Sequence, residues 1–159
     1  GRLPHELGVD GPFDLITLFD VIEHVEDDLA ALEVARELLR PGGMLLVTVP
    51  ALMMLWGDHD VANHHYRRYE KAELRDVIER AGFRISRLSF FISLLFPLIY
   101  AERAVNQLRG INPKAQFDVK VPPKPINQAM LAVMSLERVL LRKLDMPIGS
   151  SLVAVCHRD

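Results

Sequence analysis

Two apolar strands with an amphipathic helix between them are predicted for the first fifty residues. The run 13–18 is rich in β-forming residues and lies between a Gly-Pro pair and a group of acidic residues, which predicts a buried strand. An aspartate at 27 or 28 then caps a helix, which ends at Pro-Gly-Gly, 41–43. The run 44–50 is apolar at nearly every position, as in a central parallel strand. The buried stripe of the helix comprises Leu29, Leu32, Ala35 and Leu39.

The segment 51–69 has no clear period and is rich in aromatic, imidazole and guanidinium groups. Loops of this length inside a compact domain are often functional, and we expect the same here. A helix is expected over about 71–81, with Gly82 as its left-handed stop. A third strand should run from residue 83 or 84 to about 90.

The segment 88–101 carries no charge, but it is shorter than the roughly 20 residues of a membrane span and contains Pro97. We expect a strand that runs into a buried helix through about residue 107. A lid over a lipid or another hydrophobic substrate is the alternative.

Four prolines keep the segment 112–125 out of helix, so we expect an extended connector. Asn127 can cap a helix through about residue 144, and 151–156 reads as a last strand. The chain 1–159 is therefore predicted to be one domain, or part of one, with a helical insertion or cap over 88–147.

Composition and charge fit an ordinary globular protein. The 159 residues are 50% hydrophobic and have a formal net charge of −2, which gives no electrostatic reason to expect nucleic acid as a partner. The single cysteine, Cys156, cannot form a disulfide within the chain, and no signal-peptide pattern opens the sequence, which favours the cytoplasm. The polar, turn-rich start without an initiator methionine leads us to expect a fragment of a longer protein.

The order of the elements and several motifs resemble the second half of class I S-adenosylmethionine-dependent methyltransferases, including those of ubiquinone biosynthesis. The resemblance implies an α/β fold: the C-terminal half of a Rossmann-like, doubly wound, mostly parallel sheet, with a final antiparallel strand and inserted helices. The motifs are the strand 13–16, the turn Glu23-His24-Val25, the helix stop 38–43, the segment 67–69, the helix end 79–83 and the entry 147–152 to the last strand.

The resemblance also implies S-adenosylmethionine as cofactor. In this family the glycine-rich turn that holds the cofactor precedes the matched region, and no Gly-x-Gly-x-Gly occurs in the 159 residues. We therefore expect the remaining cofactor contacts at Leu3, Leu18, Phe19 and Asp20, and weak binding by this chain alone. The strand 13–18 would be an exposed edge, which predicts self-association of two copies.

Asp20, Glu23 and His24 share one face if they form a helical turn. Resemblance to metal-dependent O-methyltransferases implies that these three residues hold Mg²⁺ or a transition ion, with His64 or His65 as a further ligand. Such a metal would lower the pKa of the acceptor oxygen. Without a metal, Glu23, His24 and His65 are candidate catalytic residues, with His24 in an acid–base or orienting role, or the Glu-His pair is purely structural.

The segment 51–69 supplies the candidate substrate-binding residues Trp56, His64, Tyr66 and Arg67. Aromatic and imidazole groups suit a pocket wall, and a guanidinium suits an anionic group of the substrate. Alternatively, Arg67 and its neighbour Arg68 are solvated or pair with the carboxylates at 70 and 73.

Two functions remain open from the sequence. The first is methyl transfer to a small-molecule acceptor, as O-methylation of a lipid-, quinone- or sugar-like substrate, with peripheral membrane contact. The apolar segment 88–101 and the methionine-rich helix after it favour such a substrate. The second is a non-catalytic methyltransferase-like module that binds or regulates another chain.

Overall fold

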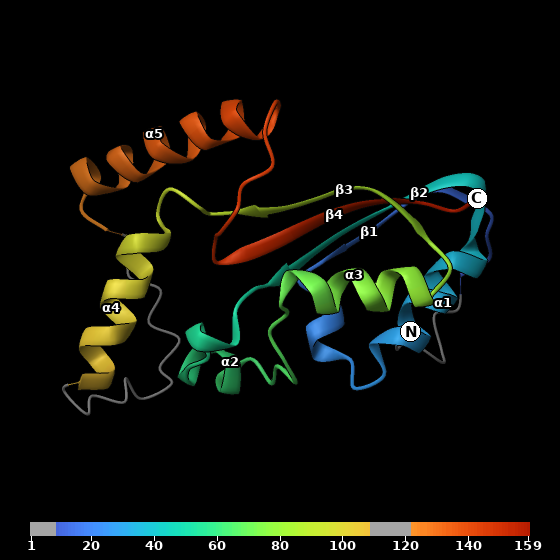
Figure 1. Ribbon diagram of the computed structural model, residues 1–159, viewed down its shortest axis with the longest axis horizontal. Coiled ribbons are helices and arrows are strands. Elements are labelled where there is room, and N and C mark those ends of the chain that lie inside the picture. The colour runs from blue at the N-terminus through green and yellow to red at the C-terminus, as the bar shows by residue number, and fades with distance from the viewer. Residues whose placement is uncertain (1–8, 109–121) are drawn as a thin grey trace.

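The computed structural model describes residues 9–108 and 122–159. In this part of the chain four strands form one sheet, and helices α1 and α3 lie along one of its faces (Figure 1). Helices α4 and α5 extend beyond the end of the sheet that is farther from the C-terminus. The elements are β1 Phe13–Phe19, η1 Ile22–His24, α1 Asp28–Leu38, β2 Leu39–Pro50, η2 Met53–Leu55, α2 Asp58–Ala62, α3 Lys71–Arg80, β3 Arg84–Phe91, α4 Phe96–Leu108, α5 Lys124–Leu141 and β4 Ser151–His157.

The strand order β1-β2-β4-β3 confirms the predicted α/β fold with a last, antiparallel strand. β1 and β2 pair in parallel, with Leu18 opposite Val47. β4 lies between β2 and β3 and is antiparallel to both, with Ala154 opposite Val47 and Leu88. β1, β2 and β3 therefore run in one direction, and their carboxyl ends meet at one edge of the sheet. In open α/β sheets this edge carries the ligands.

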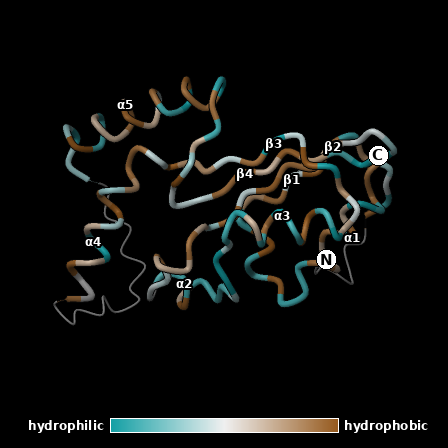
Figure 2. The backbone as a smooth tube through the Cα atoms, in the orientation of Figure 1, coloured by the Kyte–Doolittle hydropathy of each residue, from teal (hydrophilic) through white to brown (hydrophobic). Residues whose placement is uncertain are grey.

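The core lies between the sheet and the two helices on its face. Residues of β4 alternate between buried and half-buried, and in β2 every second residue from Gly43 onward is buried, as the period of two in a strand requires. Leu32 of α1 and Leu74 and Ile78 of α3 are fully buried against them. Figure 2 shows hydrophobic residues concentrated along the strands and alternating with hydrophilic ones along these helices. Truncating one such leucine to alanine costs roughly 2–5 kcal/mol of stability.

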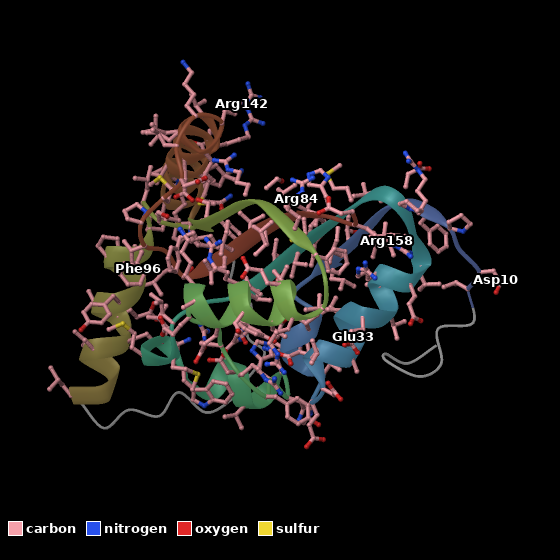
Figure 3. The ribbon with its side chains drawn as sticks, turned by 45° about the vertical axis from the view of Figure 1, so that its right-hand side comes forward. Asp10, Glu33, Arg84, Phe96, Arg142 and Arg158 are labelled. Carbon is pink, nitrogen blue, oxygen red and sulfur yellow. The ribbon has the colours of Figure 1, made fainter. Side chains whose placement is uncertain are left out.

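The predicted Pro-Gly-Gly helix stop lies inside β2, which corrects the expected boundary. Leu39, expected in the helix stripe, is extended and begins the strand. Arg158 causes the difference, because its backbone exchanges hydrogen bonds with Gly42 and Gly43 at 2.7 and 2.9 Å. Its guanidinium also donates to carbonyls of the last turn of α1, at 2.7 Å to Arg36 (Figure 3). The end of α1 is thus set by a residue from the other end of the chain.

The apolar run 13–18 predicts a buried strand and the family resemblance predicts an exposed edge; β1 is largely exposed. It is the edge strand of the sheet, so a neighbour covers only one of its sides. Leu15 and Phe19 are 49% and 52% exposed, and Leu18 is the buried residue of the strand. The exposed edge on which the self-association prediction depends is therefore present.

The middle of the chain follows the prediction in part. α3 and β3 lie within a residue of their expected bounds, and Gly82 has the expected positive φ, +83°. The segment 51–69, expected to be a loop, contains the short helices η2 and α2. Their local hydrogen bonds do not depend on a hydrophobic period, which is why the pattern did not show them.

Helices α4 and α5 differ from expectation in burial and in their start. α4 was expected to be buried, yet Leu98 is 63% exposed, because α4 lies beyond the end of the sheet. α5 begins before Asn127, since Pro123 takes the N-cap position and Pro125 fits the first turn. Across 9–108 and 122–159, no helix has both the length and the apolar character needed to cross a membrane. Most of the predicted connector 112–125 lies outside the described residues.

Candidate functional site

A cavity of about 390 Å³ lies at the carboxyl ends of β1 and β2. Its walls come from segments far apart in the sequence, so the tertiary fold assembles it. The lining residues are Asp20, Glu23 and His24 after β1; Pro50 and Leu55 after β2; His59, Asn63, His65 and Arg68 from the 51–69 segment; Ile99 and Arg103 on α4; and Ser150 and Ser151 at the start of β4.

Asp20 is the residue at which β1 turns into the site. Its backbone is left-handed, with a φ of 51°, a conformation that aspartate tolerates better than most residues. Thr48 of β2 holds the turn: its carbonyl accepts from the Asp20 N–H at 3.0 Å, and its hydroxyl donates to the Asp20 carboxylate at 3.3 Å. This turn leads directly into η1 and so brings Glu23 and His24 to the cavity.

Glu23 is a fully buried carboxyl group. Its exposed fraction is 0%, and neither side-chain oxygen has a hydrogen-bond partner among the described residues. Burial away from water raises the pKa of Glu23 to about 7, and the nearby Asp20 carboxylate adds to the rise. An unsatisfied buried carboxyl destabilises a fold, so its presence at a cavity is a strong indication of function.

Asp60 orients the imidazole ring of His65. This buried carboxylate accepts from Arg68 Nε at 2.8 Å, from the Gly57 N–H at 2.9 Å and from His65 Nδ1 at 2.9 Å. Burial alone would raise the pKa of Asp60, but the Arg68 guanidinium and the other donors hold it below its ordinary value. Because an ionised carboxylate has no proton to donate, we assign the proton to Nδ1 of His65, which leaves Nε2 as a base or a metal ligand.

His24, His65 and Glu23 form one cluster. The two imidazole rings meet edge to face with centroids 4.6 Å apart, and one potential ligand atom from each of the three residues lies within 4.8 Å of the others. Burial lowers the pKa of His65, against the opposing effect of Asp60, and so favours the neutral ring. The expected ligand set of Asp20, Glu23 and His24 stays a prediction: the structure brings His65, expected as a further ligand, to Glu23 and His24, while Asp20 is held by Thr48.

A second hollow, of about 590 Å³, adjoins the cluster and shares His24, Asn63 and His65 with the first. It contains three of the four predicted substrate-binding residues, Trp56, His64 and Tyr66. The Tyr66 N–H donates to the Glu23 carbonyl at 2.8 Å, which ties this segment to η1.

Arg67 lies apart from both hollows. Its guanidinium pairs with Asp28 at 2.8 Å and donates to the Glu26 carbonyl. Asp28 also accepts from the hydroxyl of buried Tyr69 at 2.7 Å. Both arginines are thus paired as one alternative expected, but with Asp28 and Asp60, not with the carboxylates at 70 and 73, because folding brings those aspartates closer.

The residues expected to contact the cofactor lie in different surroundings. Leu3 lies outside the described residues, and the Leu18 side chain packs into the core and not toward the site. Phe19 is exposed at the strand end, and Asp20 lines the cavity. An exposed aromatic ring beside a carboxylate suits an aromatic molecule with a cationic group. The contacts of these residues with S-adenosylmethionine stay a prediction, and the sequence holds no glycine-rich turn.

Sequence reasoning missed Asp60 and Arg103. Asp60 lies in a segment without a periodic pattern, although its spacing to His65 and Arg68 could have suggested a local network. Arg103 is an ordinary charged residue on a helix, and nothing in the sequence indicates that α4 returns to the ends of β1 and β2.

Residues 4–88 match the model of the methyltransferase domain family. In sequence, the chain is similar to a ubiquinone biosynthesis O-methyltransferase of Xanthomonas euvesicatoria, at 33% identity over 92 residues, which is 50% of this chain and 38% of that protein. It is also similar to a protein of Mycolicibacterium smegmatis named a "Probable S-adenosylmethionine-dependent methyltransferase", at 33% identity over 78 residues, 48% of this chain and 30% of that protein. These matches span well under half the length of the relatives.

Solved structures agree on the fold. A SAM-dependent methyltransferase from Thermotoga maritima aligns with a TM-score of 0.54 and 16% identity, over 99% of this chain and 60% of that chain. Phosphoethanolamine N-methyltransferase 2 of Haemonchus contortus, solved with S-adenosyl-L-methionine, aligns with a TM-score of 0.51 and 16% identity, over 94% of this chain and 34% of that chain. The chain has a class I methyltransferase fold. It belongs to the methyltransferase domain family.

Proposed function

We propose that the protein to which this chain belongs transfers a methyl group from S-adenosylmethionine to an oxygen of a small-molecule acceptor. The single observation that carries the proposal is the Glu23–His24–His65 cluster at the carboxyl end of β1, in a chain of the methyltransferase domain family. The name of the Xanthomonas relative favours an oxygen acceptor. The proposal extends to a lipid-, quinone- or sugar-like acceptor; the apolar residues of α4 and the name of that relative support a lipid- or quinone-like one.

Bound S-adenosylmethionine supplies an electrophilic methyl group. The acceptor hydroxyl needs a base, and we assign that role to His65, because the hydrogen bond of Nδ1 with Asp60 leaves Nε2 to accept a proton. Neutral Glu23 can donate a hydrogen bond to the acceptor, and His24 orients it. Trp56, His64 and Tyr66 line the adjoining hollow and offer aromatic and imidazole surface to the body of the acceptor.

A metal is the alternative to a purely protein-based site. Two imidazoles and one carboxylate suit Mn²⁺, Fe²⁺ or Zn²⁺ better than Mg²⁺, which prefers oxygen ligands. The set Glu23, His24 and His65 would hold the ion, and the ion would satisfy the orphaned Glu23 oxygens. It would supply Lewis-acid activation of the acceptor oxygen.

The non-catalytic module remains the second candidate function, and the exposed edge of β1 supports it, because such an edge can pair with another chain. Arg67 has no place at the site in this proposal, since it is bound to Asp28.

The test uses the full-length gene product with S-adenosylmethionine and a panel of phenols, catechols and sugars, and measures S-adenosylhomocysteine. We expect turnover that falls about 10²–10⁴-fold in His65→Gln. The matched control, Glu33→Gln on the exposed face of α1, should keep full activity. Turnover that persists in excess chelator supports the protein-based site, and turnover restored by adding Mn²⁺ or Zn²⁺ supports the metal. Cofactor binding without turnover of any acceptor would favour the module.

A further inference from the structure

Arg103 brings a positive charge from α4 to the cavity that holds the Glu23–His24–His65 cluster. We infer that Arg103 binds an anionic oxygen group, carboxylate or phosphate, on the acceptor. This inference rests on the proposed function only in that the bound molecule is called the methyl acceptor. The binding site itself does not depend on methyl transfer.

The placement of Arg103 is built into the fold. Arg103 and Ile99 are four residues apart on α4 and share the helix face that lines the cavity. Glu137 of α5, only 1% exposed, accepts the N–H groups of Ser93 and Leu94, each at 2.8 Å, just before α4 begins. This buried contact joins α5 to the backbone just before α4, and so helps to hold the helix that carries Arg103.

The Arg103 guanidinium lies close against the backbone of Gly57. A Cβ at position 57 would lie 2.5 Å from Nη1 of Arg103, closer than atoms pack. The backbone of Gly57 is extended, with φ −163° and ψ −173°, a conformation open to any residue. The absence of a side chain at this position therefore serves the close approach of Arg103 and not a special backbone angle.

The other arginine that lines the cavity, Arg68, already has hydrogen-bond partners within the protein. Arg68 is bound by the Asp60 carboxylate and the Ala51 carbonyl. Pro50, Leu55 and Ile99 give the cavity apolar walls. This arrangement suits a compact molecule with a hydroxyl at the cluster, an apolar body and an anionic group that a planar guanidinium fork can hold with two hydrogen bonds.

The experiment titrates the 159-residue chain with 4-hydroxyphenylacetate, 4-hydroxyphenyl phosphate and neutral 4-hydroxyphenylacetamide, in chelator and without a methyl donor. Dissociation constants come from calorimetry or from amide chemical shifts. We expect one anion to bind at least about 10-fold more tightly than the amide, as a charge-assisted pair requires. The tighter of the two anions distinguishes a carboxylate from a phosphate.

Arg103→Gln should abolish this preference and leave amide binding unchanged, and Gly57→Ala should weaken the preference by displacing the guanidinium. Arg67→Gln is the matched control, because Arg67 lies outside the cavity, and it should retain the preference. Circular dichroism confirms that each variant is folded. Equal affinity for the three probes, or a preference that survives in Arg103→Gln, would overturn the inference. An anion preference in a full-length protein without any methyl transfer would uphold this site and refute only the proposed function.

Discussion

The buried carboxyl of Glu23 should make the stability of the chain depend on pH in a way that one substitution removes. Glu23→Gln keeps the shape of the side chain and eliminates its titration. In the wild type, the folded state holds Glu23 protonated up to a pKa of about 7, against an ordinary value of 4.5. At pH below 4.5 the group is protonated in both the folded and the unfolded chain and has no differential effect.

Between pH 4.5 and 7 the unfolded chain releases this proton while the folded chain keeps it. The unfolded state then binds fewer protons, so the free energy of unfolding falls as pH rises. Above pH 7 both states are ionised and the loss is complete. The gap between the two pKa values, at 1.36 kcal/mol per pH unit, corresponds to about 3 kcal/mol. The wild type therefore has this much less stability at pH 8 than at pH 4.5, relative to the variant.

The assay is urea denaturation of wild type and Glu23→Gln across pH 4.5–8, in chelator so that no metal binds the carboxylate. We expect the stability difference, variant minus wild type, to grow by about 3 kcal/mol over this range. Glu33→Gln, on the exposed side of α1, is the matched control, and its curve should run parallel to wild type because its side chain is in solvent in both states. A difference between Glu23→Gln and wild type that stays constant with pH would refute the reasoning.

Three further predictions concern the contacts of Glu137, the binding of the cofactor and the exposed edge of β1. Glu137→Ala should lower the free energy of unfolding by about 2–4 kcal/mol, because the N–H groups of Ser93 and Leu94 lose their acceptor. The control Arg138→Ala, at an exposed position, should change this free energy little. Equal urea midpoints for the two variants would contradict the prediction. The 159-residue chain should bind S-adenosylmethionine far more weakly in calorimetry than the full-length gene product, since it has no glycine-rich turn; comparable dissociation constants would argue against it. Sedimentation should show self-association of the wild type that Leu15→Lys abolishes at the β1 edge, and a monomeric wild type would show that this edge does not pair.

The chemistry of the site could be predicted only where it is local in the chain. Glu23 and His24 follow a strand directly, so their position at its carboxyl end follows from the strand itself. His65 was identified by residue type, but only the fold shows that its ring contacts that of His24 and that Asp60 directs its proton. No periodic pattern in the sequence predicts either contact, because both depend on distances between side chains that exist only in the folded chain.

The sense of the last strand was implied by the resemblance to class I methyltransferases, whereas the hydrophobic pattern alone predicted the strands and the helices of the core. The physical reason is that burial of apolar side chains imposes a period of two or 3.6 on the residues that make these elements. Only the folded chain shows that Arg158 contacts the end of α1 and that Arg103 reaches the cavity. Each of these features depends on contacts between segments that are far apart in the sequence. The hydrophobic pattern of a single segment does not predict such contacts.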